Sequence, residues 1–235
     1  MDFLSELRAE LVRNSTEKER ISGLRFFKEE VKLLGLKTAL VAEIGKDFLQ
    51  KLEDKSKKNI FSLCEDLFKS GIMEESFVAC QWSYTLKRQY KPEDFDVFER
   101  WVHKYVNNWA TCDTLCNHNV GTIVEMYPEL MPRLKQWSES ENRWVKRASA
   151  VSLIIPARKG KFLKDIFEIA DTLLVDPDDM VRKGYGWMLK AASQAHQEEV
   201  FSYVIKNKGA MPRTALRYAI EKMPSELKSL AMSKS

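Results

Sequence analysis

Apolar residues recur at helical spacing through nearly the whole chain, and this pattern constrains the fold more than any other feature. Within residues 36–52, for example, apolar side chains stand four positions apart at Leu40, Ile44, Phe48 and Leu52. Such spacing places side chains on one face of an α-helix, and no segment shows the convincing apolar and polar alternation of a half-buried strand. The sequence therefore predicts an all-α protein.

Short turn signals divide this helical pattern into segments. They occur at Gly35, residues 53–56, Gly71, Pro92, Pro128, Pro156, residues 176–177, Gly209 and Pro224. Because no long linker separates these points, the pattern predicts about a dozen short helices joined by tight turns. With 235 residues, 44% of them hydrophobic, the chain can build a continuous core, and we expect a single domain over residues 1–235.

The sequence gives no indication of a membrane or secreted protein. No apolar stretch approaches the roughly 20 residues that a membrane-spanning helix needs. The first six residues, MDFLSE, lack the basic and then apolar pattern of a signal peptide. We therefore expect a cytoplasmic protein without a membrane partner.

The four cysteines, Cys64, Cys80, Cys112 and Cys116, show no spacing of the kind found in disulfide-rich secreted domains. Reduced thiols are the expected state. Cys112, Cys116 and His118 could be metal ligands, but no second ligand pair follows at zinc-site spacing, and buried cysteine is common in helical cores. We favour the core role and expect no metal.

Basic residues are concentrated late in the chain. The formal net charge of +4 is small, yet residues 181–235 hold ten Lys or Arg against four Glu. Residues 141–165 form a second positive segment. Clusters of this kind are either solvated faces or phosphate-contacting surfaces, and charge alone does not separate the two interpretations.

Two of the six tryptophans stand beside residues that indicate a functional role. Tryptophan in a helical protein is usually part of the core. Trp109, however, lies four residues before Asp113, so that a helix would project an indole and a carboxylate from one face. Trp187 follows Gly184 and Gly186, where the missing side chains could let DNA or another helix approach closely. For Trp82, Trp101, Trp137 and Trp144 we keep the core role.

The spacing of the singled-out residues indicates a repeat. Arg147 follows Trp109 by 38 residues, and Trp187 follows Arg147 by 40. These intervals are close to the roughly 40 to 47 residues of a HEAT-type helix pair. Stacked helix pairs curl into a superhelix whose concave side suits an extended ligand. Coincidence among large helical residues is the alternative.

The blocks at residues 107–114, 142–148 and 182–189 together resemble the AlkD-type DNA alkylation repair glycosylases. This HEAT-like family carries W-x-x-x-D, W-x-x-R and G-W elements, and the resemblance runs through nearly the whole chain. It implies a HEAT-like helical-repeat superhelix, an α-solenoid, with a concave DNA-binding face. It also implies duplex DNA containing alkylated bases as the partner, no cofactor, and a protein that we expect to be a monomer.

The resemblance also implies roles for individual residues. Asp113 would face the deoxyribose of an alkylated nucleotide, and the rings of Trp109 and Trp187 would contact its positive charge. Arg147 would hold the neighbouring phosphate. Phe26 and Lys190 stand where the family often has an aromatic and a basic residue near DNA. Arg213 and Arg217 are phosphate contacts by charge and by resemblance. For Phe26 a core role, and for Lys190, Arg213 and Arg217 a solvated or intrahelical role, are the alternatives.

The leading interpretation is a DNA glycosylase that excises cationic alkylpurines such as N3-methyladenine and N7-methylguanine. Asn108 and Ala110 stand where better-known members carry a second Trp and an Asp. This departure keeps open a DNA-binding paralogue without glycosylase chemistry that recognises distorted or branched DNA. A protein-binding HEAT-like scaffold is the third hypothesis, because such repeats commonly cradle helices or peptides.

Overall fold

The computed structural model describes residues 2–233, and regular structure in this part of the chain is helical. Its β-type pairing is limited to an isolated bridge between Lys32 and Ile72. The all-α prediction is therefore confirmed. Within the same described range, every helix is too short or too polar to cross a membrane.

The chain divides into two compact units, Met1–Leu115 and Cys116–Ser235. Each unit packs its helices around its own apolar interior. That the chain behaves as one domain stays a prediction.

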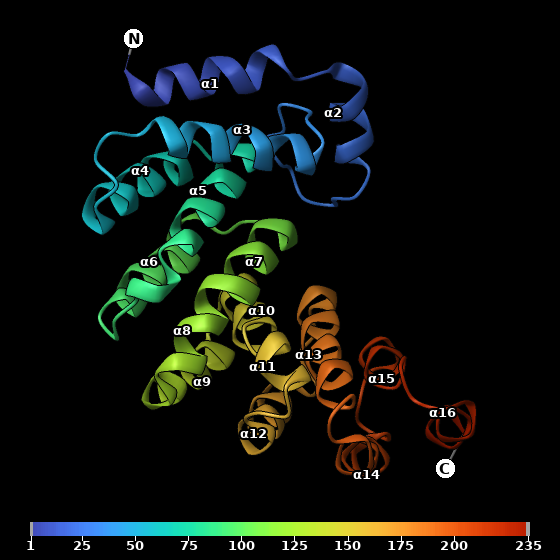
Figure 1. The fold of residues 1–235 in the computed structure, drawn as a ribbon. Helices are drawn as coiled ribbons and strands as arrows, with labels where there is room; N and C mark the ends of the chain where they lie inside the picture. The colour runs from blue at the N-terminus through green and yellow to red at the C-terminus, as the bar shows by residue number, and fades with distance from the viewer. Residues whose placement is uncertain (1, 234–235) are drawn as a thin grey trace. The chain divides into compact units, whose positions relative to one another are not determined.

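The first unit is built around α5 (Figure 1). Its helices are α1 (Phe3–Arg13), α2 (Glu17–Leu24), α3 (Thr38–Lys51), α4 (Lys57–Lys69), α5 (Met73–Thr85), α6 (Asp94–Tyr105) and α7 (Trp109–Leu115), with a 3-10 turn at Lys87–Gln89. Helix α5 packs against α3, α4 and α7, while α4 also contacts α6. Helices that pack against their neighbours along the chain in this way are typical of stacked helix pairs.

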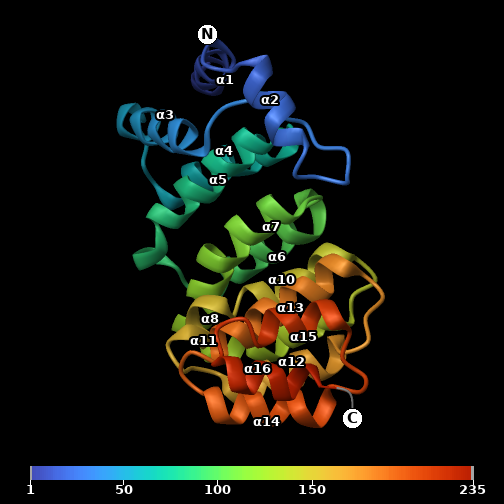
Figure 2. The same cartoon turned by 90° about the vertical axis from the view of Figure 1, so that its right-hand side faces the viewer.

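The second unit is built around α13 (Figure 2). It begins with a π-helical turn at Cys116–Val120 and continues through α8 (Gly121–Met126), α9 (Met131–Gln136), α10 (Arg143–Val151), α11 (Ile154–Arg158), α12 (Leu163–Leu173), α13 (Asp179–Ala192), α14 (Gln197–Asn207), α15 (Arg213–Ala219) and α16 (Ser225–Met232). Two 3-10 turns lie at Pro128–Leu130 and Trp137–Glu139. Helix α13 packs against α10, α11, α12 and α15.

Local sequence explains where many of these helices begin. The first turn of a helix leaves N–H groups without an intrahelical acceptor, and a short polar side chain just before it can accept from one of them. Such caps are made by Asp2, Thr16, Ser56, Asn142 and Asp178 at α1, α2, α4, α10 and α13.

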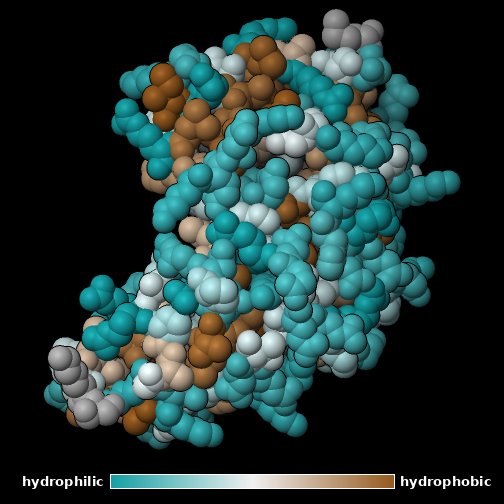
Figure 3. All heavy atoms as spheres, turned by 180° about the vertical axis from the view of Figure 1, so that it is seen from behind, coloured by the Kyte–Doolittle hydropathy of each residue, from teal (hydrophilic) through white to brown (hydrophobic). Residues whose placement is uncertain are grey.

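The four tryptophans assigned to the core are buried as predicted. Trp82 and Trp101 are fully inaccessible, and Trp137 and Trp144 are at most 7% exposed. Large hydrophobic residues that remain exposed are few and scattered, namely Val12, Ile21, Phe26, Met126, Val175 and Leu230. Figure 3 shows one face of the molecule, where hydrophilic residues cover most of the surface and hydrophobic residues gather in a few patches, the broadest near the top of the view.

Candidate functional site

The helix that carries Trp109 and Asp113 is started by Asn108. The side-chain oxygen of Asn108 accepts a hydrogen bond from the backbone N–H of Thr111 at 2.9 Å, and its backbone oxygen accepts from Cys112 at 3.1 Å. This is the geometry of an N-cap, so Trp109 becomes the first residue of α7. Asn108 departs from the family pattern, and the structure gives it a role in starting this helix.

Trp109 and Asp113 lie on the same face of α7, one turn apart, as predicted. Both side chains are partly exposed, whereas the intervening Ala110, Thr111 and Cys112 are buried. A four-residue separation on an α-helix brings two side chains above one another. The first unit therefore presents an indole and a carboxylate side by side at its surface.

Trp109 is held by a segment far away in the sequence. Its indole N–H donates a hydrogen bond to the backbone oxygen of Phe26 at 3.3 Å. The ring of Phe27 stacks on the indole, with ring centroids 5.3 Å apart and an angle of 19° between the ring planes. Phe26 itself is 72% exposed, which excludes the core role that the sequence left open for it.

Phe27 is a member of this cluster that sequence reasoning missed. The two adjacent phenylalanines, Phe26 and Phe27, are evident in the sequence. Helical periodicity, however, does not show that the ring of Phe27 reaches Trp109. The loop that carries the pair folds back onto α7, and that return depends on contacts between distant residues. The one signal in the sequence that points to Phe27 is its position directly after Phe26.

Arg147 is buried in the second unit. It lies on α10 with 5% of its surface exposed, and one guanidinium nitrogen donates to the backbone oxygen of Met180 at 2.5 Å. A methyl group added at Gly184 of α13 would stand 3.2 Å from Cγ of Arg147, so the glycine leaves room for the arginine stem. Arg147 thus joins α10 to α13, and its contact with DNA phosphate stays a prediction.

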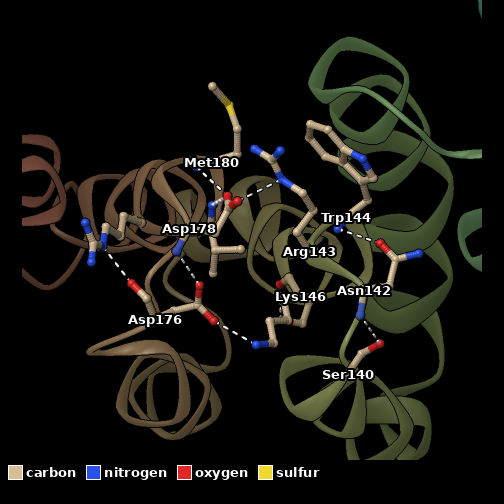
Figure 4. A network of polar contacts seen from close by, with 11 residues as sticks. Ser140, Asn142, Arg143, Trp144, Lys146, Asp176, Asp178 and Met180 are labelled. Atoms are coloured by element: carbon tan, nitrogen blue, oxygen red, sulfur yellow. Dashed lines mark hydrogen bonds and ion pairs between the residues drawn. The ribbon is translucent and has the colours of Figure 1, made fainter. Parts of the chain in front are cut away.

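A polar network beside Arg147 fastens the same two helices (Figure 4). The carboxylate of Asp178 caps α13 by accepting from the N–H of Met180 at 2.8 Å, and it pairs with Arg143 of α10 at 2.9 Å. The carboxylate of Asp176 pairs with Lys146 at 2.9 Å and accepts from the N–H of Asp178 at 2.8 Å. Two basic residues of the positive segment 141–165, Arg143 and Lys146, are therefore paired with carboxylates within the fold.

Other basic residues of that segment also have acidic partners. Lys159 and Lys161 both pair with Glu125 of α8 at 2.9 Å, and Lys164 lies 3.8 Å from Glu168. The acidic partners come from neighbouring helices or the next turn, so the sequence segment is more positive than the surface that it forms. The solvated-face interpretation gains support here over a dedicated phosphate surface.

The two glycines before Trp187 admit neighbouring protein groups. A methyl group at Gly186 would lie 2.8 Å from Cβ of Tyr218 and 2.9 Å from the backbone oxygen of Ala215, both on α15. Gly184 faces Arg147 in the same way. The sequence left open whether DNA or another helix approaches these glycines, and at Gly186 the structure places another helix, α15. Trp187 itself is partly exposed on α13.

Lys190, Arg213 and Arg217 differ in how strongly the fold holds them. Lys190 pairs with Glu221 at 2.9 Å, and its side chain is only 16% exposed. Arg213 is exposed and donates to the backbone oxygen of Met232 at 3.4 Å. Arg217 is exposed one helical turn later on α15. Among the three, the two arginines offer the more accessible charge, and DNA contact by any of them stays a prediction.

The predicted functional residues are divided between the two units. Trp109, Asp113 and Phe26 belong to Met1–Leu115, and the basic residues with Trp187 belong to Cys116–Ser235. Cys112 and Cys116 are fully buried, in keeping with the core role. In the portion of the chain that the structure covers, no three His, Cys, Asp or Glu side chains group as metal ligands would.

Helices stacked on their neighbours within each unit define an all-α helical-repeat protein. The family model for DNA alkylation repair enzymes matches residues 7–223, and the chain belongs to that family. A solved structure described as a predicted DNA alkylation repair enzyme from Enterococcus faecalis has the same fold, with a TM-score of 0.79 at 14% identity, covering 90% of this chain and 98% of that chain. No curated protein matches the sequence significantly.

Proposed function

We propose that this protein is a DNA glycosylase that hydrolyses the N-glycosidic bond of cationic alkylated purines, N3-methyladenine and N7-methylguanine, in duplex DNA. Family membership supports a role in DNA alkylation repair. The observation that carries the finer proposal is the pairing of Trp109 and Asp113 on one partly exposed face of α7.

The proposed reaction needs charge stabilisation more than proton transfer. A purine alkylated at N3 or N7 is positively charged, so when the bond from C1′ to the base breaks, the electron pair leaves with a base that becomes neutral. The sugar is left as an oxocarbenium-like cation, which water attacks at C1′ before losing a proton. Asp113 would stabilise that cation: at about 4 Å and an effective dielectric near 20, the attraction is on the order of 4 kcal/mol. Realised only as charge develops, this corresponds to roughly a thousandfold in rate.

Trp109 would contribute by contacting the cationic nucleotide with its ring face. Such cation–π attraction contributes about 0.5 to 2 kcal/mol, depending on desolvation. The indole is already oriented by the Phe26 oxygen and the Phe27 ring, so little reorganisation accompanies binding. We extend the proposal to Trp187 as a second aromatic contact and to Arg147, Arg213 and Arg217 as phosphate contacts.

Release of methylated base from alkylated duplex DNA tests the proposal. The wild-type protein should release N7-methylguanine, and Asp113→Asn should lower single-turnover excision by about a hundredfold while keeping most DNA affinity, because an amide cannot replace the carboxylate charge. Asp47→Asn, an exposed change on α3, is the matched control and should excise normally. Unchanged excision by Asp113→Asn would remove that residue from the mechanism.

A second candidate function is DNA binding without base excision. Asn108 and Ala110, which flank Trp109, are both buried, so neither adds a polar group at the surface beside Asp113. A protein of this kind would bind duplex or branched DNA with strong salt dependence and release no base from methylated DNA. Binding together with absent base release by wild type would favour this candidate over the glycosylase.

A further inference from the structure

The loop between α2 and α3, residues 25–37, has little regular secondary structure, and we call it the strap. Its first residues, Phe26 and Phe27, contact Trp109. A loop without its own helix or sheet hydrogen bonds needs other acceptors for its backbone N–H groups. The positions of those acceptors determine how firmly the strap holds Phe26 and Phe27 against Trp109.

The far end of the strap is anchored by Glu74. Its carboxylate accepts hydrogen bonds from three consecutive backbone N–H groups, those of Leu34 at 3.0 Å, Gly35 at 2.8 Å and Leu36 at 3.3 Å. Glu74 is 2% exposed and is the second residue of α5, where a helix N-terminus favours negative charge. A buried carboxylate that accepts from three consecutive backbone N–H groups is a strong local anchor.

Backbone contacts strengthen the same anchor. Lys32 forms the isolated bridge with Ile72, and its backbone oxygen accepts from the N–H of Met73 at 3.0 Å. The oxygen of Gly35 accepts from the N–H of Thr16 at 2.9 Å, at the residue that caps α2. Gly35 has a φ of 101°, which glycine adopts readily, and a side chain at this position would collide with the backbone oxygen of Thr16.

A chain of contacts connects the anchor with Trp109. Cδ1 of Leu33, directly before the anchored residues, lies 3.1 Å from where a side chain of Gly23 would begin. The backbone oxygen of Gly23 accepts from the N–H of Phe26 at 3.1 Å, and the oxygen of Phe26 accepts from Trp109. All of these residues belong to the first unit, and together they connect the anchored end of the strap with the indole.

We propose that Glu74 is a positioning residue that holds the strap and thereby fixes the orientation of Trp109. Its effect on catalysis rests on the proposed glycosylase function, whereas its effect on Trp109 does not. Displacement of a contacting group by about 1 Å can cost on the order of a hundredfold in rate. Partial loosening of the strap should cost less, about tenfold.

Glu74→Gln tests the proposal, with Glu75→Gln as the matched control. The control residue is the next one on α5 and equally buried, but its carboxylate pairs with Arg8 of α1 at 3.0 Å. Both substitutions remove one buried carboxylate. Only Glu74→Gln removes a carboxylate that accepts hydrogen bonds from the strap. The primary readout is the indole ¹H–¹⁵N resonance of Trp109, assigned among the six tryptophans by its loss in Trp109→Phe.

Glu74→Gln should shift or broaden the Trp109 resonance and lower single-turnover release of N7-methylguanine by about tenfold, with affinity for undamaged duplex changed less than twofold. Glu75→Gln should do neither. An unmoved Trp109 resonance in folded Glu74→Gln, or an equal change in Glu75→Gln, overturns the proposal. If the wild-type protein releases no base, the proposed function fails while the resonance still decides the role of Glu74.

A second variant covers the case in which Glu74→Gln does not fold. Leu33→Ala keeps the carboxylate of Glu74 but removes the side chain that lies beside Gly23. The Trp109 resonance should move in this variant as well. A Trp109 resonance that stays at its wild-type position in Leu33→Ala contradicts the proposed connection.

Discussion

The indole nitrogen of Trp109 donates a hydrogen bond to the backbone oxygen of Phe26, a residue 83 positions earlier in the chain. The contact joins the first residue of α7 to the loop after α2, and the stacked ring of Phe27 reinforces it. An aromatic side chain that is only partly covered by the core is thus fixed on one side by a distant segment. That arrangement leaves the ring oriented before any ligand arrives.

Excision should depend on the positive charge of the lesion. In the proposed mechanism Asp113 stabilises the sugar cation, and none of the proposed site residues protonates a neutral leaving base. N3-methyladenine and N7-methylguanine should therefore be released, while uracil and hypoxanthine should remain in the DNA. Chromatographic detection of free base from four matched duplexes is the measurement. Release of uracil at a rate comparable with that of N7-methylguanine would contradict the mechanism.

Arg147→Met separates the structural role of Arg147 from its predicted DNA role. The methionine keeps an apolar stem beside Gly184 but leaves the oxygen of Met180 without its guanidinium donor. We expect the free energy of unfolding to fall by about 1 to 3 kcal/mol. If the arginine also contacts a phosphate, the slope of log affinity against log salt should fall by about one.

Urea denaturation and DNA-binding titrations at several salt concentrations check the two effects of Arg147→Met separately. The binding loss should be the same for damaged and undamaged duplexes, because a phosphate is present in both. Lower stability with an unchanged salt slope would assign Arg147 to the fold alone.

Gly186→Ala should destabilise the second unit. The added methyl group would meet the backbone oxygen and Cα of Ala215 at 2.9 and 3.1 Å, and backbone atoms cannot move aside as a flexible side chain can. Such overpacking costs about 1 to 3 kcal/mol, whereas the better helix propensity of alanine offsets at most about 1 kcal/mol. Gly209→Ala, which would meet nothing within 4 Å, is the control for thermal denaturation. Equal melting temperatures for the two variants would refute the close packing of α13 on α15.

Glu65 should make stability depend on pH in the acidic range. The hydrogen bond from Arg100, together with those from Tyr105 and Trp101, lowers the pKa of the Glu65 carboxyl from 4.5 to about 2. Because the folded state holds the proton less tightly, the contribution to stability is complete above pH 4.5 and is lost as the pH falls toward 2.

Urea unfolding at a series of pH values measures the contribution of Glu65. The free energy of unfolding of wild type should fall more steeply between pH 4.5 and 2 than that of Glu65→Gln, which has no carboxyl to protonate. Glu53→Gln, at an exposed position, should follow wild type. Parallel curves for wild type and Glu65→Gln would show that the carboxyl is not perturbed as described.

The sequence alone determined the features that depend on local periodicity. Helical spacing of apolar residues predicted the all-α fold, and it placed Trp109 and Asp113 on one face of a helix. Burial of Trp82 and Trp101 was predicted separately, because tryptophan in a helical protein is usually part of the core. These predictions succeed because an α-helix sets the relation between residues a few positions apart, whatever the rest of the chain does.

The pairing of residues that are distant in the sequence became visible only in the folded protein. The tertiary structure brought Phe27 onto Trp109, buried Arg147 against α13, and placed Asp176 beside Lys146 so that a basic segment lost part of its charge. It also showed that Gly186 admits a helix. Such contacts depend on how loops return and how helices pack over tens of residues, and local sequence periodicity does not specify that geometry.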